Sequence, residues 1–139
     1  MRAAQFRAMR ETLGLSQEDV GDAVGVDRES VESWEAGEYP ISDDVAEWIS
    51  CEKAVADYAV NSAIGGILAL PNPPATVSLT YYRTQEEYDK FGCGDGPFVI
   101  GNANARRVAD ALEAERIDCE FYYLGESEAV ETCSPHTRG

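Results

Sequence analysis

The sequence predicts a mostly α-helical N-terminal domain, joined by a long helix to a small α+β C-terminal domain with a three-stranded sheet. Three observations lead to this prediction. Apolar residues recur at helical spacing up to residue 70. A proline-rich break follows at 71–74. Beyond it, segments rich in β-forming residues appear. We therefore expect a helical domain, a connecting helix, a small α/β domain and a disordered tail, at 1–41, 42–70, 75–124 and 125–139.

The clearest local pattern is a pair of short helices, 17–24 and 28–36, on either side of a tight turn. Ser16 is a good N-cap for the first helix and Asp27 for the second, because their side-chain oxygens accept hydrogen bonds from free amides of the first turn. Gly21 has no side chain, so another helix can approach closely there. The pattern therefore predicts two helices packed against each other.

Helices are also predicted on both sides of this pair. Phe6, Met9 and Leu13 share one face of a helix over 2–13. A long helix over 43–70 follows the pair, and the stripe expected to be buried along it is Val45, Trp48, Ile49, Val55, Ala59, Ala63 and Ile67. Since the helix-turn-helix pair alone cannot cover so long a stripe, its far half should pack on the C-terminal domain or on a second subunit.

Strands and helices alternate after the proline-rich break. In order, we expect a strand at 76–83, a short helix at 85–91, a loop at 92–97, a strand at 98–100, a helix from Asn102 or Asn104 to 115 with Val108, Ala109 and Leu112 inward, and a strand at 119–124. The glycines of the loop are interpreted as turn formers, because the loop lacks the lysine of a phosphate-binding loop and precedes a strand. This order predicts a three-stranded sheet covered by helices.

The N-terminal pattern resembles the helix-turn-helix of the phage-repressor (Cro/C1, or XRE) family. The residues that carry the resemblance are Phe6, Met9, Arg10, the run Gly14-Leu15-Ser16-Gln17, the run Trp34-Glu35-x-Gly37, and Pro40. The match covers about the first 50 residues without a gap. It implies a lambda-repressor-like domain that binds double-stranded DNA, with the helix at 28–36 in the major groove.

The resemblance also implies roles for single residues. The residues that it assigns to DNA are Gln17, Arg28, Glu29, Ser30, Ser33 and Arg10. Arg28 can bond guanine O6 and N7, Glu29 can accept from cytosine N4, and Ser33 is permissive. Simple solvation is the alternative for Glu29, and an exposed position at the helix start is the alternative for Gln17. In the family the matching arginine pairs with the glutamate of W-E-x-G, so Arg10 has two candidate roles, an ion pair with Glu35 and a contact near a DNA phosphate.

A second and looser resemblance covers the rest of the chain. The segments D-D-V-A-E-W, L-T-Y-Y-R-T-Q-E-E-Y-D and F-V-I-G, followed by an aromatic strand, look like those of the YdiL-like regulators. That group includes autorepressors associated with anti-CRISPR operons. This resemblance implies a C-terminal dimerisation domain, a homodimer and an inverted-repeat operator.

The net charge of −15 is unusual for a protein that binds DNA, since cations normally supply affinity for phosphates. Two explanations keep the DNA interpretation: a local basic patch, or a salty host in which charges are screened. The patch would consist of Arg2, Arg7, Arg10 and Arg28. A third explanation replaces DNA: the module is an acidic protein-binding adaptor or a DNA mimic.

Catalysis, cofactors and metals find no support in the sequence. The only histidine, His136, lies in the polar tail, so no imidazole base is at hand to activate a nucleophile. The four cysteines, Cys51, Cys93, Cys119 and Cys133, have no metal-binding spacing and are interpreted as free thiols. We therefore expect a protein that is not an enzyme and has no cofactor or metal.

Membrane insertion is not expected either. Residues 1–15 have no continuous apolar core of the kind found in a secretory signal. The longest apolar run, 59–70, is broken by Asn61 and is too short to span a bilayer. These features favour a soluble, cytoplasmic protein.

Overall fold

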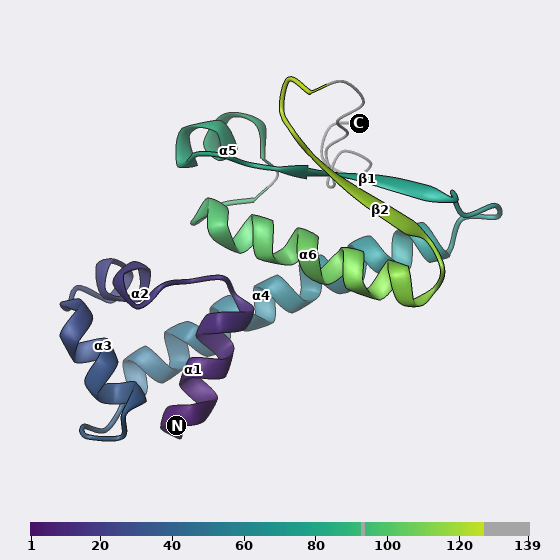
Figure 1. Ribbon diagram of the computed structural model, residues 1–139. Coiled ribbons are helices and arrows are strands. Elements are labelled where there is room, and N and C mark those ends of the chain that lie inside the picture. Colours follow the sequence, from purple (N-terminus) through teal and green to yellow (C-terminus); the bar gives the residue numbers. More distant parts are fainter. Residues whose placement is uncertain (93, 127–139) are drawn as a thin grey trace. The chain divides into compact units, whose positions relative to one another are not determined.

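The computed structural model describes residues 1–92 and 94–126 and divides into two compact units, Met1–Ala56 and Asp57–Gly139. Figure 1 shows the course of the chain. Its elements are α1 (Ala3–Thr12), α2 (Gln17–Val24), α3 (Arg28–Glu35), α4 (Asp43–Leu68), β1 (Thr76–Tyr81), α5 (Gln85–Phe91), α6 (Phe98–Ala114) and β2 (Asp118–Tyr123). The units meet inside α4, whereas the proline-rich segment was the expected boundary.

The first unit is a small helical domain with one apolar core. Its most deeply buried side chains are Phe6, Leu13, Val20, Val31 and Ile49, which come from all four helices of the unit and the loop after α1. The Phe6 ring also meets the indole of Trp34 edge-on, with 6.0 Å between the ring centroids. These contacts hold α1 and the first half of α4 around α2 and α3.

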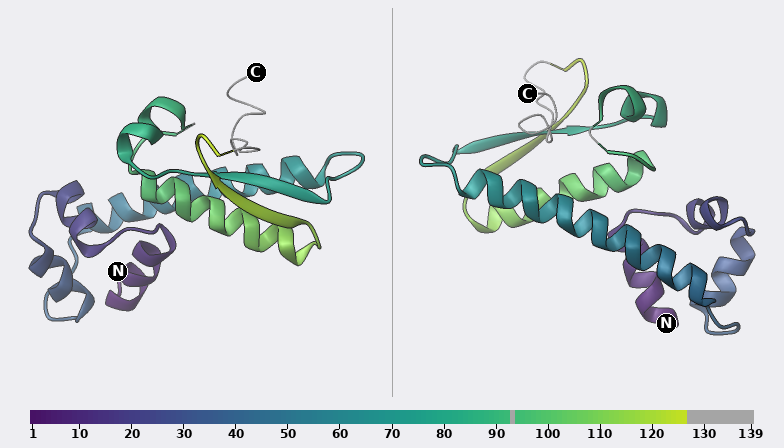
Figure 2. Two further views of the ribbon diagram at one scale, coloured as in Figure 1. Left: turned by 45° about the horizontal axis from the view of Figure 1, so that its top comes forward. Right: turned by 180° about the vertical axis from the view of Figure 1, so that it is seen from behind.

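Helix α4 is continuous over 26 residues (Figure 2). Its buried positions are Val45, Ile49 and Ala56 in the first unit and Val60 in the second. The expected stripe is wrong at two positions, because Val55 is 69% exposed and Ala59 is also exposed. A helix of 3.6 residues per turn brings Ala56 and Val60, one position later in each case, onto the buried side.

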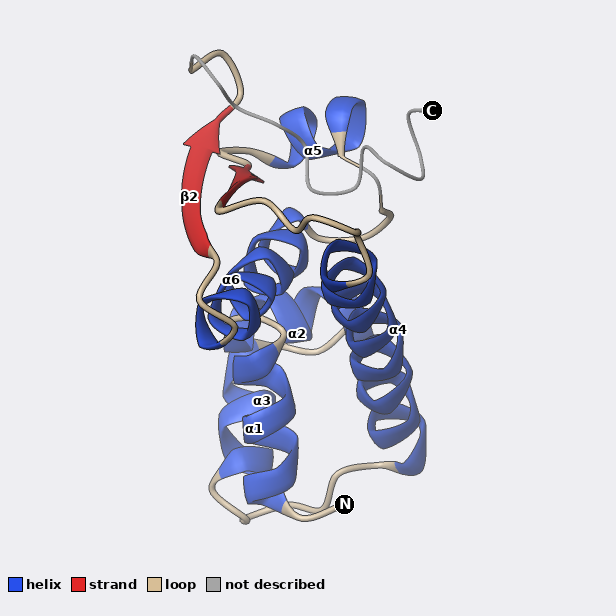
Figure 3. Cartoon of the chain, turned by 90° about the vertical axis from the view of Figure 1, so that its right-hand side faces the viewer, coloured by secondary structure: helices blue, strands red, loops and turns tan. Residues whose placement is uncertain are grey.

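Among the described residues, the sheet of the second unit has two strands, not the three that the sequence predicts (Figure 3). Strands β1 and β2 are parallel, in a register that pairs Leu79 with Phe121. The segment expected to be the missing strand, 98–100, is instead the first turn of α6. Parallel strands need a crossover connection, and α5 and α6 supply it here.

The side-chain amide of Gln85 explains why α6 begins at residue 98. Pro97 is its N-cap residue but offers no capping side chain. The Gln85 side chain caps the helix instead. Its Oε1 accepts from the Phe98 amide at 2.9 Å, and its Nε2 donates to the Gly96 carbonyl at 2.9 Å. A run of three apolar residues fits a helix as well as a strand, so the glutamine decides between them.

The sequence suggests that Asn102 or Asn104 begins this helix. Both residues instead lie within α6. The buried side-chain amide of Asn102 exchanges two hydrogen bonds with the backbone of Tyr82, each 2.9 Å long. Tyr82 directly follows β1, so the amide satisfies backbone groups that a neighbouring strand would otherwise bond.

The core of the second unit lies between the sheet and two helices. It is built from Val60, Leu79, Val108, Ala109, Leu112 and Ile117. Figure 1 shows α6 and the second half of α4 along the same face of the sheet. The predicted inward positions of α6, at 108, 109 and 112, are therefore confirmed. The expected disordered tail lies outside the described residues from 127 onward, as do Cys93, Cys133 and His136.

Candidate nucleic-acid interface

The start of α2 is fixed by a capping box. The Ser16 hydroxyl accepts from the Asp19 amide at 2.9 Å, and the Asp19 carboxylate accepts from the Ser16 amide at 2.8 Å. The end of the helix is set by Gly25, which adopts the left-handed conformation at φ 78° and ψ 33°. Both ends of α2 are therefore encoded locally, as a helix of only eight residues requires.

The start of α3 is held by Asp27. Its carboxylate accepts from the backbone amide of Ser30 at 2.9 Å and from the Ser30 hydroxyl at 2.7 Å. These bonds lower the pKa of Asp27, the one from the Ser30 side chain most strongly. The Ser30 hydroxyl is therefore engaged in the cap, which limits its use as a base contact.

Close approach at Gly21 sets the geometry between the two helices. A Cβ at this position would lie 2.6 Å from the Val26 carbonyl oxygen in the turn. Only glycine allows this packing without a shift of backbone. The angle between α2 and α3 thus depends on the absence of a side chain at residue 21.

A partly buried ion pair ties α1 to α3. The Arg10 guanidinium donates from Nε to one Glu35 oxygen at 2.6 Å and from Nη2 to the other at 2.9 Å, and it donates from Nη1 to the Leu15 carbonyl at 2.9 Å. The Arg10 and Glu35 side chains are 11% and 5% exposed. This bidentate geometry makes the pair a structural clamp, one of the two roles expected for Arg10.

The first residue of α2 joins the same network. Gln17 donates from Nε2 to Glu35 Oε1 at 3.2 Å. Burial raises the pKa of Glu35, but hydrogen bonds from Arg10 and Gln17 and the charges of Arg10 and Arg7 outweigh it, and the pKa is lowered overall. The hydrogen bond to Glu35 raises the pKa of Arg10. Two residues that the sequence assigns to phosphates, Arg10 and Gln17, are thus already bound to one carboxylate.

Arg28, the expected base reader, has a carboxylate partner on its own helix. Its guanidinium lies 2.8 Å from Glu32 Oε1, and the two side chains are 60% and 43% exposed. An exposed pair of this kind stabilises a helix by only a few tenths of a kcal/mol. The arginine is therefore accessible, and a nucleic acid needs to displace only one weak contact to bind it.

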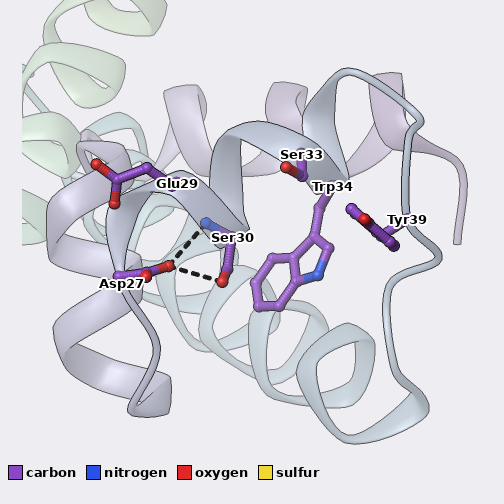
Figure 4. A pocket seen from close by; sticks show the side chains of 6 residues that line it. All are labelled: Asp27, Glu29, Ser30, Ser33, Trp34 and Tyr39. Atoms are coloured by element: carbon purple, nitrogen blue, oxygen red, sulfur yellow. Dashed lines mark hydrogen bonds between the residues drawn. The ribbon is translucent and has the colours of Figure 1, made fainter.

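An open pocket lies beside α3 (Figure 4). It is lined by Asp27, Glu29, Ser30, Ser33, Trp34 and Tyr39. Glu29 and Ser33 therefore share one surface, as the resemblance implies. The sequence assigned no role to Tyr39, which is 66% exposed and lies in the loop after α3; an aromatic residue just after the W-E-x-G run was the available signal.

The expected basic patch is reduced by pairing with acids. Arg7 lies 3.3 Å from Glu11 on α1, and Arg10 and Arg28 have the glutamate partners described above. Of the four arginines proposed for the patch, three thus have a carboxylate partner. Little net positive charge is left to attract DNA over a distance.

Comparison with known families matches this same part of the chain. Residues 3–49 match a family model described as a helix-turn-helix domain. No curated protein matches the chain. The matched segment runs from the start of α1 into α4 and contains the capped helix pair and the Arg10–Glu35 clamp. The chain thus carries a helix-turn-helix domain, which indicates a DNA-binding regulator in general terms.

Neither a metal site nor a membrane-spanning helix occurs in the described part of the chain. Within the described residues, no group of three or more His, Cys, Asp or Glu side chains is placed to hold a metal ion. No helix in residues 1–92 and 94–126 combines the length and apolar character needed to cross a membrane. Cys51 and Cys119, the two cysteines that the structure describes, are free.

Proposed function

We propose that this protein is a homodimeric, sequence-specific DNA-binding regulator that represses transcription, its own gene included, from an inverted-repeat operator. The observation that carries the proposal is the helix-turn-helix domain at residues 3–49. Helix α3 of this domain presents an accessible arginine, Arg28, in its first turn. An adaptor or DNA mimic is not favoured, because the family match is to a DNA-binding type of domain.

The first helical turns of α3 would read the bases. In a helix-turn-helix, the second helix enters the major groove and its N-terminal residues contact base edges. Arg28 is the first residue of α3 and would bond guanine O6 and N7 after leaving Glu32. Glu29 would accept from cytosine N4, and Ser33 would tolerate several bases.

Helices α1 and α2 would position the domain on the backbone. The free amides at the start of α2 suit a phosphate oxygen, and Gln17 opens that helix. Arg10 would act mainly through Glu35, by fixing how α1 and α3 pack. We assign the phosphate contact to Gln17 and the amides beside it. Arg10, whose three guanidinium nitrogens all bond within the domain, would keep a positioning role near the phosphate.

Repression would follow from occupancy of a promoter. A dimer presents two recognition helices, which read half-sites about one helical turn, or 34 Å, apart. The resemblance of the C-terminal part to YdiL-like regulators, including autorepressors of anti-CRISPR operons, supports a dimer and control of its own gene. No step of this mechanism requires catalysis or a cofactor, and we propose that the protein has neither.

Operator selection is the direct test of this function. Purified protein is incubated with a library of random duplex DNA at low and at high salt, and bound DNA is sequenced after several rounds. The proposal expects an inverted repeat to be enriched by the parent protein and a base preference to be lost from each half-site with Arg28→Ala. A dimer that enriches no sequence at any salt concentration would refute the proposal.

A further inference from the structure

The exposed side of α4 in the second unit is unusual in its composition. Tyr58 is 77% exposed, more than any other large apolar side chain in the described residues. Ala59, Ser62, Gly65 and Gly66 are also exposed. On a helix of 3.6 residues per turn, all five lie within about 60° of Ser62. They form one strip, called here the α4 face.

Two glycines in this strip have no explanation within a single chain. A Cβ built at Gly65 or Gly66 meets no atom within 4 Å, so nothing in the described chain requires glycine at either position. A glycine within a helix is about 1 kcal/mol less favourable than alanine. Close approach of another backbone is the common reason for such glycines.

The lack of charge on the α4 face indicates which kind of partner can bind there. The chain is 27% charged, yet no charged residue occurs between Asp57 and Arg83. Two copies that each carry a net charge of −15 repel each other, so a contact between them is favoured where neither contributes charge. Because the α4 face is neutral, it is complementary to itself and offers nothing to a phosphate or a basic protein.

The order of large and small residues fits a two-fold axis. In an isologous contact, residue i meets j and j meets i. With two α4 helices antiparallel and Ser62 at the axis, Tyr58 lies opposite Gly66 and Ala59 lies opposite Gly65. A parallel pair would instead oppose Tyr58 to Tyr58 and leave the glycines facing each other across a gap.

We infer that the α4 face binds a second copy of this chain through an antiparallel helix contact, in which Tyr58 of each copy fills the notch at Gly65 and Gly66 of the other. This inference rests on the proposed function, since it supplies the homodimer that an inverted repeat requires. A contact of five helix positions is smaller than the roughly 800 Å² per partner of a standard interface. The dimer therefore dissociates at micromolar concentration, and two adjacent half-sites stabilise it.

The first test measures self-association without DNA. Sedimentation equilibrium of the full chain is compared for the parent, Tyr58→Ala, Gly66→Gln and Asn61→Gln. The Gly66→Gln side chain would fill the notch between two copies, but in a single chain a Cβ at this position meets no other atom within 4 Å. The stability of this variant to urea should therefore equal or exceed that of the parent. We expect at least tenfold weaker dimerisation for Tyr58→Ala and Gly66→Gln. The matched control, Asn61→Gln, is exposed at the edge of the strip and dimerises as the parent does.

The second test locates the axis. In a chain whose four native cysteines are replaced by alanine, Ser62→Cys is compared with Asn61→Cys under mild oxidation. Helix axes about 8 to 10 Å apart leave facing Cα atoms at a two-fold axis about 3.5 to 5.5 Å from each other, and the upper part of this range suits a disulfide. The inference expects a rapid covalent dimer for Ser62→Cys and little for Asn61→Cys.

The outcomes distinguish a failure of the inferred dimer contact from a failure of the proposed function. A chain that stays monomeric at all concentrations, or a dimer that Gly66→Gln leaves unchanged and Ser62→Cys does not cross-link, overturns the inference even if the protein binds its operator. A dimer through this face that selects no DNA sequence supports the inference and removes the proposed function.

Discussion

Three arginines of the first unit are each balanced by a glutamate, but the three pairs differ in what they do. Arg10 and Glu35 are nearly enclosed and bidentate. Arg7–Glu11 and Arg28–Glu32 are exposed pairs four residues apart on one helix. Burial therefore separates a clamp that holds the domain together from contacts that a nucleic acid can replace.

The acidic partner of Arg28 leads to the first prediction. Glu32→Gln frees the arginine and removes a negative charge close to where phosphates would lie. We expect affinity for the selected operator to rise about fivefold, which corresponds to about 1 kcal/mol, the energy of one charge pair at contact distance in water. Fluorescence anisotropy with labelled operator measures this change.

Glu86→Gln is the matched control for that prediction. It removes the same charge and also breaks an exposed i,i+4 pair, Glu86 with Lys90, but on α5 in the second unit. Affinity should stay within twofold of the parent. If both variants bind alike, or if Glu32→Gln binds more weakly, Glu32 does not restrain Arg28.

The clamp leads to a prediction about pH. The pKa of Glu35 is lowered in the folded state, so its contribution to stability is present at neutral pH. It is lost as the pH falls below about 4.5 and through the lowered value. Glu35→Gln leaves Arg10 without its counter-ion and should reduce the free energy of unfolding by about 1 to 3 kcal/mol at pH 7. The reduction should be smaller at pH 3.

Urea unfolding followed by circular dichroism at several pH values between about 3 and 7 checks this result. The comparison variant is Glu11→Gln, which breaks the exposed pair with Arg7 and should change stability little at either pH. A deficit of Glu35→Gln that is the same at pH 3 and pH 7 would show that the carboxylate charge does not matter.

Side-chain roles could be predicted only where a local pattern encodes them. The caps at Ser16 and Asp27 follow from the residue type and its place before an apolar helix, and the Arg10–Glu35 pair was expected from the resemblance. The partners of Gln85 and Asn102 depend on rotamers and on contacts 11 to 20 residues distant in sequence. No pattern in the sequence reports those.

Helices and strands, like side-chain roles, could be predicted only where a local pattern encodes them. Both helices of the helix-turn-helix pair were predicted within a residue, because caps mark their ends. The strand expected at 98–100 is wrong, because a three-residue apolar run has no period to distinguish strand from helix. The burial of α4 was wrong at Val55 and Ala59, since neighbouring apolar positions compete for one face and only the packed partner decides between them.

The packing of α6 against the Tyr88 ring of α5 leads to a prediction about stability. A Cβ at Gly101 of α6 would lie 2.7 Å from the Tyr88 ring of α5, whereas a Cβ at Gly66 of α4 meets open space. Gly101→Ala should therefore destabilise the protein by about 1 to 3 kcal/mol through overpacking. Gly66→Ala should stabilise it by about 0.5 to 1 kcal/mol.

Thermal or urea unfolding at low protein concentration checks that Gly101→Ala lowers the free energy of unfolding and that Gly66→Ala raises it. Low concentration keeps self-association out of the comparison. If Gly101→Ala is as stable as the parent, then α5 and α6 do not pack around Tyr88 as the structure shows.

For the whole molecule, which has a net charge of −15, the few arginines of the expected basic patch limit how steeply binding to DNA depends on salt. Counterion release gives a slope of log affinity against log salt of about −0.9 for each phosphate contact. Arg2, Arg7 and Arg10 are the cations at hand besides the base reader, which gives at most six phosphate contacts for a dimer. The slope should therefore be no steeper than about −5, measured by operator binding at several salt concentrations.

The measurement that tests the central claim most directly is the affinity of the protein for duplex DNA from upstream of its own gene, beside Arg28→Ala. We predict saturable binding to an inverted repeat, weakened by salt. The arginine variant should bind about 10- to 100-fold more weakly, as expected for loss of a bidentate base contact. If the parent protein does not bind this DNA at any salt concentration, or if it binds and Arg28→Ala binds equally well, the account of α3 as the recognition helix is contradicted.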